Sequence, residues 1–327
     1  MFTGRPDSFP WLVADIGGTN ARFALYTGGT EPEQIKVLAC ADYPTLEAAV
    51  RAYLADVGAT VRHASIGIAN PVTGDWVQMT NHHWAFSIEA TRQALALESF
   101  LVINDWAAMA LALPHLPADA LIKVGGGEAV AGAPCALIGP GTGLGVSALV
   151  PHTHGATPVP GEGGHVSFAP FDEREAQIWH FARERYGHVS AERLLSGPGL
   201  VLIYQALAAL AGEEAEDLRA ADISTRALSG ECPRCRETLD AFCAMLGTAA
   251  ANLTLTLGAR GGVYLGGGIV LRLLDYFQSS PFRARFEDKG RFSGYLAAVP
   301  VYIMTHAMPA LLGATAALAA HLEEQHA

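Results

Sequence analysis

An acidic residue followed by two glycines and a threonine is the first group in the chain that suits a specific chemistry. An apolar strand at residues 13–16 delivers Asp15 into a turn made by Gly17, Gly18, Thr19 and Asn20. The Asp15 carboxylate is suited to a magnesium ion, bound directly or through its waters, and glycines let backbone N–H groups approach an anion closely. Paired glycines also occur in ordinary hairpins, so this segment alone predicts either a phosphate-binding turn or a structural one.

Two further glycine-rich turns repeat this pattern downstream. The second lies between two predicted strands and contains Gly139, Gly141, Thr142 and Gly143. The third follows a predicted strand at residues 262–265 and leads into a predicted helix through Gly266, Gly267 and Gly268. Three such turns in order favour a nucleotide site over structural turns, although glycine-rich strand ends are common in α/β proteins. The chain has no Walker A loop, and its first turn lacks the G-x-G-x-x-G spacing of a dinucleotide site.

Polar residues at other strand and loop ends are candidates for a small-molecule site. Asn104 and Asp105 follow a predicted strand at the start of a helix, where open α/β sheets bind ligands, but either residue could simply cap that helix. Glu162 and His165 lie in the glycine-flanked loop P-G-E-G-G-H, which is poor material for a core. Glu192 precedes a sharp turn, and a solvated helix carboxylate is the competing interpretation of that residue.

Composition and charge exclude several classes of protein. The chain has 327 residues, half of them hydrophobic, which is enough for two packed domains. Its formal net charge of -11 disfavours a nucleic-acid partner or an anionic membrane surface, because these need clustered Lys and Arg. We find no run of about 18 apolar residues and no apolar signal-peptide core near the start, so a cytoplasmic protein is expected.

The five cysteines do not form a disulfide framework in a chain of this length. Cys232 and Cys235 form a C-x-x-C pair, but no further His or cysteine pair at usable spacing completes a zinc site. The residues after Cys235 have a helical pattern rather than that of a thioredoxin-like strand. We therefore interpret these cysteines as buried residues or residues at the start of a helix.

Predicted strands and helices alternate along the chain, which is typical of α/β proteins. Residues 64–69 and 100–103 are predicted strands, and residues 46–57 form a predicted helix with one apolar stripe. Two prolines at residues 114 and 117 indicate a domain boundary. The alanine-rich segment at 311–321 is predicted to be a helix that packs on the first domain, because it has no basic face for lipid.

These motifs together resemble bacterial glucokinase, within the hexokinase, actin and chaperone ATPase superfamily. The resemblance runs from about Leu12 to Leu318 and includes D-I-G-G-T-N-A-R-F-A-L, I-N-D, G-P-G-T-G-L-G, P-G-E-G-G-H-V-S-F-A-P, A-E-R-L-L-S-G-P-G and F-E-D-K-G-R-F. The related repressor and sugar-kinase family carries a zinc-binding cysteine cluster and often a helix-turn-helix extension. Neither is visible here, because C-P-R-C lacks the C-x-C-G pattern and few residues precede Leu12.

The resemblance implies an α/β, two-domain, actin-like ATPase (ribonuclease H-like) fold with an active-site cleft between the domains. The small domain would comprise residues 1–115 and 305–327, and the large domain residues 116–304. Asn104, Asp105, Glu162, His165 and Glu192 would bind glucose, with Asp105 also the catalytic base. Asp15 would hold Mg²⁺, and the three glycine turns would bind ATP. The family is commonly homodimeric.

The function implied is ATP-dependent phosphorylation of glucose to glucose 6-phosphate, the first step of glycolysis. A kinase for mannose, N-acetylglucosamine or fructose would share every phosphate motif and would differ only in its sugar loops. A sugar-responsive regulator without turnover is the alternative from another class. Asp105 and the lack of a DNA-binding segment argue against that alternative.

Overall fold

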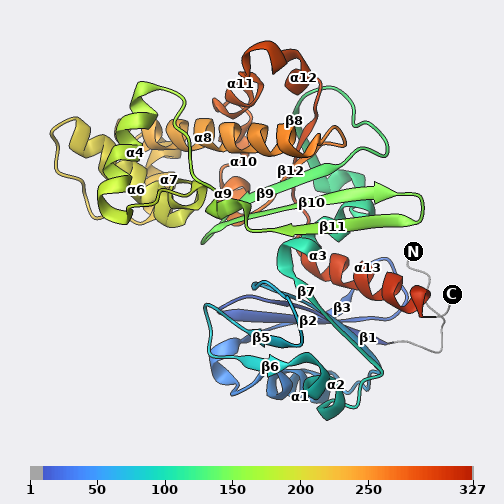
Figure 1. The fold of residues 1–327 in the computed structure, drawn as a ribbon. Helices are drawn as coiled ribbons and strands as arrows, with labels where there is room; N and C mark the ends of the chain where they lie inside the picture. The colour runs from blue at the N-terminus through green and yellow to red at the C-terminus, as the bar shows by residue number, and fades with distance from the viewer. Residues whose placement is uncertain (1–9, 326–327) are drawn as a thin grey trace. The chain divides into compact units, whose positions relative to one another are not determined.

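The computed structural model describes residues 10–325, which form two compact α/β units (Figure 1). Among these residues, unit 1 comprises 10–117, 157–160 and 306–325, and unit 2 comprises 118–156 and 161–305. The predicted domain division at residues 115/116 and 304/305 stays a prediction. The residues on which the expectation about a signal peptide rests lie at the start of the chain, and residues 1–9 are outside the described range.

Unit 1 is built on a five-stranded sheet in the order β3-β2-β1-β4-β7. The strands are β1 (Trp11–Ile16), β2 (Asn20–Tyr26), β3 (Glu33–Ala39), β4 (His63–Ile68) and β7 (Ser99–Asn104), and a separate hairpin consists of β5 (Trp76–Gln78) and β6 (Ala85–Ser87). Strands β1, β4 and β7 are parallel, and their register places Ile16, Ile68 and Asn104 side by side. The carboxyl ends of these three strands therefore form one edge, where a ligand is expected.

Helices cover both faces of the unit 1 sheet (Figure 1). They are α1 (Leu46–Val57) and α2 (Ile88–Ala94) on one face, and α3 (Asp105–Ala112) and α13 (Pro309–Glu324) on the other. Side chains alternate along β1 accordingly, since Leu12 and Ala14 belong to the cluster that includes α1, whereas Val13 packs with Leu311 of α13. The predicted packing of the C-terminal helix on the first domain is confirmed.

Helix α1 has the bounds that its sequence pattern predicts, because local signals mark both ends. The Thr45 hydroxyl accepts a hydrogen bond from the Ala48 N–H at 3.1 Å, which caps the first turn. Gly58 ends the helix with φ 65°, a left-handed conformation that favours glycine. Leu46, Ala49, Val50 and Tyr53 form its buried stripe.

The second sheet has six strands in the order β11-β10-β9-β12-β13-β8, which belong to unit 2 apart from residues 157–160 of β11. Its strands are β8 (Leu121–Gly125), β9 (Cys135–Pro140), β10 (Leu144–His152), β11 (Gly155–Gly161), β12 (Val263–Leu265) and β13 (Val301–Met304). Strand β9 pairs antiparallel with β10 and parallel with β12, and β12 pairs parallel with β13. The series β10-β9-β12-β13 thus has the same relative strand directions as β2-β1-β4-β7 of unit 1.

Helices of unit 2 enclose its main hydrophobic core. They are α4 (Glu173–Tyr186), α5 (Ala191–Leu194), α6 (Gly197–Leu210), α7 (Ala220–Ser229), α8 (Pro233–Leu257), α9 (Gly268–Arg272), α10 (Leu274–Phe277), α11 (Phe282–Glu287) and α12 (Ser293–Ala297). Helix α8 is the one described helix that is long and apolar enough to cross a membrane, but 72% of its most apolar window is buried. Its apolar surface is therefore accounted for by the protein core.

The C-x-x-C pair lies at the start of α8. The Cys232 sulfur accepts a hydrogen bond from the Cys235 N–H at 3.2 Å, so Cys232 caps the helix. Burial raises the pKa of the Cys235 thiol to about 12, which makes it a poor nucleophile near neutral pH. The interpretation of these residues as buried or helix-start cysteines is confirmed.

Candidate functional site

The first glycine turn connects β1 and β2 in unit 1. The Gly17 N–H donates to the Asn20 carbonyl at 2.9 Å, and the Cys40 N–H donates to the Thr19 carbonyl at 2.9 Å, which fixes the turn. A side chain at Gly18 would lie 3.0 Å from the Asn81 Cβ. The loop at residues 80–84 packs closely against the turn, so a side chain at Gly18 would fit only if Asn81 shifted slightly.

That loop contains the run Asn81-His82-His83-Trp84. Trp84 is buried, and its indole N–H donates to the Tyr43 carbonyl at 2.9 Å. The exposed Asn81 lies against the glycine turn at Gly18. The loop is thus a structural support for the first glycine turn.

Asp15 is the penultimate residue of β1 and has one ion-pair partner among the described residues. The Arg22 guanidinium donates to Asp15 Oδ2 at 2.9 Å, and the Asp15 side chain keeps 21% of its surface exposed. Burial raises the pKa of the Asp15 carboxyl, although the Arg22 charge opposes this rise. An added cation would therefore stabilise the ionised form of this carboxylate.

The link between β7 and α3 positions Asn104 and Asp105. Asn104 Oδ1 accepts hydrogen bonds from the N–H groups of Trp106 at 2.9 Å and Ala107 at 3.1 Å, so Asn104 is the helix cap. Its Nδ2 donates to Asp105 Oδ1 at 3.0 Å. The capping interpretation is therefore correct for Asn104, and the same side chain also orients the Asp105 carboxylate.

Asp15 and Asp105 lie near each other at one edge of unit 1. Asp15 is in register with Gly67 on the neighbouring strand β4. A side chain at Gly67 would lie 3.5 Å from the Asp105 Cα, so the first turn of α3 covers this glycine directly. The predicted metal ligand and the predicted base are consequently separated by the width of one glycine-bearing strand.

The second and third glycine turns are joined in unit 2. The Gly266 N–H donates to the Ile138 carbonyl at 3.0 Å. Gly267 has φ 86°, and a Cβ on it would lie 2.3 Å from the Pro140 carbonyl oxygen. Only glycine fits this position, because both the backbone conformation and the close approach of β9 exclude a side chain.

The three remaining predicted side chains come from segments that pack on β10 of the same unit, with Glu192 in α5 and Glu162 and His165 at the 3₁₀ turn after β11. Glu192 Oε2 accepts a hydrogen bond from the Leu144 N–H at 2.9 Å, and its carboxylate occupies the space beside Gly143. Glu192 is therefore anchored to the hairpin rather than freely solvated. The competing interpretation of Glu192 as a solvated helix carboxylate is wrong.

Glu162 and His165 flank a short 3₁₀ turn at Gly163–His165. The His165 Nε2 lies 3.9 Å from Glu162 Oε2, and both side chains are more than half exposed, at 62% and 60%. Only glycine fits at position 164, because a Cβ there would lie 2.2 Å from the Leu144 carbonyl oxygen. Close packing of the turn on β10 thus holds two polar side chains at the surface, free to contact a ligand.

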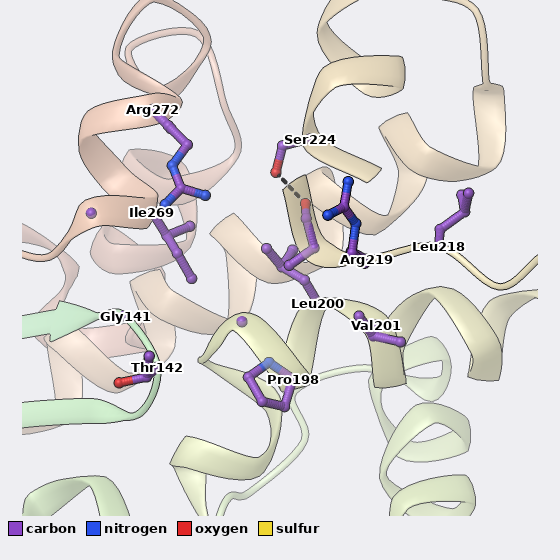
Figure 2. Close-up of a pocket in the computed structure, with 13 residues that line it drawn as sticks. Gly141, Thr142, Pro198, Leu200, Val201, Leu218, Arg219, Ser224, Ile269 and Arg272 are labelled. Atoms are coloured by element: carbon purple, nitrogen blue, oxygen red, sulfur yellow. Dashed lines mark hydrogen bonds between the residues drawn. The ribbon is translucent and has the colours of Figure 1, made fainter. Parts of the chain in front are cut away.

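A pocket of about 680 Å³ opens beside the joined glycine turns. Figure 2 shows side chains from α6, α7 and α9 around it. It is lined by Gly141, Thr142, Gly197, Pro198, Leu200, Val201, Leu218, Arg219, Ala220, Ser224, Gly268, Ile269 and Arg272. Its volume suits a small molecule or cofactor, and its walls combine apolar side chains with two arginines.

The structure gathers the predicted residues into two groups. Unit 1 holds Asp15, the turn at residues 17–20, Asn104 and Asp105, and unit 2 holds the other two turns with Glu162, His165 and Glu192. Sequence reasoning missed the pocket walls on α6 and α7 and the cation Arg272. The Gly197-Pro198-Gly199 sequence at the start of α6 is the signal in the chain for this pocket wall. In the structure the Gly197 N–H donates to the Gly141 carbonyl at 2.8 Å, which joins α6 to the second glycine turn.

Comparisons with known proteins agree with one another. The family model described as Glucokinase matches residues 12–321. A glucokinase from Chromobacterium violaceum is 61% identical over 323 residues, covering 98% of this chain and 93% of the relative. The crystal structure of glucokinase from an Antarctic psychrotroph is 39% identical with a TM-score of 0.86, covering 94% of this chain and 98% of that one.

A more distant structure shares the fold. It is that of a ROK family glucokinase from Streptomyces griseus in complex with glucose and AMPPNP, which is 19% identical with a TM-score of 0.62 and covers 95% of this chain and 99% of that one. The predicted two-domain, actin-like α/β fold is confirmed by these neighbours. With the family model and the 61% identical relative, they lead to one conclusion. The chain belongs to the glucokinase family.

Proposed function

We propose that this enzyme transfers the γ-phosphoryl group of ATP to the 6-hydroxyl of glucose, with Asp105 as the catalytic base and Asp15 as the magnesium ligand. The observation that carries this mechanism is the placement of both carboxylates at one edge of unit 1, on either side of Gly67. Phosphoryl transfer needs an acceptor hydroxyl and a neutralised phosphate held near each other. Asp105 would bind the acceptor hydroxyl, and Asp15 would hold the Mg²⁺ that neutralises the phosphate.

Asp105 would accept a hydrogen bond from the 6-hydroxyl and take its proton as the new P–O bond forms. The Asn104 amide at 3.0 Å restricts the orientation of the carboxylate, which favours a productive geometry. The fixed helix start behind it also limits reorganisation during the reaction. Proton transfer to a positioned base contributes about 100-fold to 10,000-fold to rate.

Asp15 fits a magnesium ion that is held mainly by nucleotide phosphates and water. Residues 10–325 contain no group of three His, Cys, Asp or Glu side chains that could bind a metal by themselves. A single carboxylate with several waters and phosphate oxygens is a common way to bind Mg²⁺. When bound, the ion neutralises charge on the phosphate oxygens.

ATP is proposed to occupy the pocket of unit 2 with its base against Leu200, Val201 and Leu218. Its phosphates would approach Gly141, Thr142 and Gly268, which line the same pocket. The remaining proposed contacts are the backbone N–H groups of Gly17, Gly18, Thr19, Asn20, Gly139, Gly143, Gly266 and Gly267. The AMPPNP complex of the Streptomyces griseus relative supports a nucleotide donor.

Glucose hydroxyls are proposed to bind Asn104, Asp105, Glu162, His165 and Glu192. An analogue that lacks one hydroxyl would leave its partner unpaired, at a cost of about 1 to 3 kcal/mol. Glu192 is already fixed by the Leu144 N–H, so its second oxygen remains available to a hydroxyl. These side chains would therefore select the sugar.

A coupled assay tests the proposal directly. Purified enzyme with ATP and Mg²⁺ is expected to phosphorylate glucose with a higher kcat/KM than mannose, fructose or N-acetylglucosamine. Turnover should disappear when EDTA exceeds the magnesium. A higher kcat/KM for another hexose would assign a different substrate, and sugar binding without turnover would support a regulator.

We further expect a cytoplasmic homodimer that binds neither nucleic acid nor membrane. The net charge of -11 supports the expected lack of nucleic-acid and membrane binding, because proteins that bind these anionic partners need clustered basic residues. Size-exclusion chromatography with light scattering tests the dimer. A mass corresponding to one chain at micromolar concentration would contradict it.

A further inference from the structure

Arg272 is the last residue of α9 and lines the pocket of unit 2. Figure 2 shows its side chain beside Ile269, with the guanidinium directed into the pocket. Its Nη2 lies 3.8 Å from the position that a Cβ on Gly268 would occupy. The cation is therefore next to the third glycine turn and within reach of a ligand held there.

The second arginine of the pocket is already paired. Arg219 donates to Asp222 through Nε at 2.9 Å and through Nη2 at 3.1 Å. Within residues 10–325, the structure shows no hydrogen bond or ion pair to the Arg272 guanidinium. Arg272 is thus the arginine of this pocket that has no carboxylate partner among the described residues.

The charge of the pocket contrasts with that of the whole chain. Its 13 lining residues include two arginines and no aspartate or glutamate, whereas the chain has a net charge of -11. An acidic protein that leaves an unpaired cation in a pocket without acids creates a local site for an anion. A guanidinium also matches phosphate oxygens through two parallel hydrogen bonds.

The two sides of the pocket differ in chemistry. In Figure 2, Gly141 and Arg272 lie on one side, and Leu218 and Val201 lie on the opposite side together with the carboxylate-paired Arg219. An aromatic base packs well against the apolar side. The glycines and the cation suit an anionic group on the other side, because backbone N–H groups and a guanidinium both bind phosphate.

We infer that Arg272 binds the phosphate chain of the nucleotide and makes the pocket select nucleotides by their number of phosphates. This inference rests on the proposed function, because it places ATP in the unit 2 pocket. Arg272 supplies positive charge from the protein in addition to any bound cation. Adenosine lacks the recognised group, so Arg272 contributes nothing to its binding.

The test compares Arg272→Gln and Arg272→Lys with the wild type by competition against ATP. Adenosine, AMP, ADP and ATP are titrated into the full enzyme with saturating glucose. The Gln variant is expected to lose about 10-fold to 100-fold in affinity for ADP and ATP, the range for a charge-assisted hydrogen bond. Its affinity for adenosine and its KM for glucose should be unchanged, and Lys should restore part of the loss.

Arg260→Gln is the matched control, because Arg260 is an exposed arginine of unit 2 outside the pocket. It removes the same charge and should leave all nucleotide affinities unchanged. An equal loss for adenosine and ATP in Arg272→Gln would overturn the inference, since it would place the guanidinium on the base. An equal loss in Arg260→Gln would overturn it too, because net charge alone would explain the effect.

Val201→Trp separates the inference from the proposed function. A tryptophan on the apolar side fills the pocket and should raise the KM for ATP. A raised KM in that variant with normal ATP affinity in Arg272→Gln would overturn the role of Arg272 and leave the nucleotide site in place. An unchanged KM in Val201→Trp would show that ATP binds elsewhere, which overturns both assignments while glucose phosphorylation itself stands.

Discussion

The Asn104 side chain joins the start of α3 to the carboxylate of Asp105. Its oxygen caps the helix through Trp106 and Ala107, and its nitrogen donates to Asp105 Oδ1 at 3.0 Å. One amide therefore stabilises the local backbone and orients the proposed base. Substitutions can separate these two contributions.

Asp105→Ala is expected to lose at least 100-fold in turnover, because a positioned base is worth about 2.7 to 5.4 kcal/mol of barrier. The melting temperature should change little, since the Asn104 cap remains. Saturated turnover and melting temperature are measured on one preparation. Near-normal turnover would remove Asp105 from the mechanism.

Asn104→Ser should keep the cap, because serine is also a favoured N-cap residue, but it removes the donor to Asp105. We expect a near-normal melting temperature with reduced turnover. Asn104→Ala should additionally lose about 0.5 to 2 kcal/mol of stability, measured by urea unfolding. Equal turnover in Asn104→Ser and wild type would mean that the amide does not orient the base.

Asp15→Asn should lower turnover far more than glucose affinity, because Asp15 is proposed to face the phosphates and the metal. Asparagine keeps the shape of the side chain and removes its charge. Calorimetric titration of glucose and a magnesium titration of turnover are the measurements. If glucose binding falls while turnover per bound glucose is kept, Asp15 belongs to the sugar site instead.

Glu162→Ala and His165→Ala should each weaken glucose affinity about 10-fold to 100-fold, the loss expected for about 1 to 3 kcal/mol of hydrogen bonding. Both side chains are largely exposed, so the free energy of unfolding should be nearly unchanged. Exposed Glu173→Ala in α4 serves as the control. Retained glucose affinity in both loop variants would place the sugar site elsewhere.

Gly267→Ala should destabilise unit 2 by about 1 to 3 kcal/mol, because alanine is strained at φ 86° and its Cβ would meet the Pro140 carbonyl. Gly141→Ala is the matched variant, since a Cβ there meets nothing within 4 Å. It should fold normally and change the KM for ATP. Equal stability of the two variants in urea unfolding would contradict the predicted strain.

Arg285→Met should lose about 3 to 5 kcal/mol of stability, because it leaves the buried Glu175 carboxylate without its ion-pair partner. The Glu175 side chain is only 1% exposed. The exposed pair of Arg51 and Glu47 is the comparison, and Arg51→Ala should lose at most about 0.5 kcal/mol. A similar small loss for Arg285→Met would show that water reaches Glu175 easily.

Local backbone signals made the glycine turns and α1 predictable. Thr45 and Gly58 mark the ends of α1, and the apolar stripe between them fixes its buried face. The strand, glycine and threonine pattern likewise predicted the turns at residues 17–20 and 139–143 without knowledge of their neighbours. Each of these features depends on residues that are adjacent in sequence.

Close contacts between segments far apart in the sequence could not be predicted residue by residue, although the packing of α13 on the first domain was. The space at Gly18 is limited by Asn81, and glycine is required at position 267 because of Pro140, which lies more than 100 residues away. The walls of the unit 2 pocket are ordinary apolar side chains of α6 and α7. Nothing in their types distinguishes them from core residues until the fold brings them beside Gly141 and Gly268.

The strand series β2-β1-β4-β7 and β10-β9-β12-β13 have the same order of antiparallel and parallel pairings. Each series begins with a hairpin whose turn contains glycine and threonine. The two hairpins differ at the strand end, where the first carries Asp15 and the second carries Ile138 and Gly139. Only one of the two similar turns therefore has a carboxylate, so the magnesium-binding role proposed for Asp15 has no counterpart in the second hairpin, whose turn offers an anion only backbone N–H groups and the Thr142 hydroxyl.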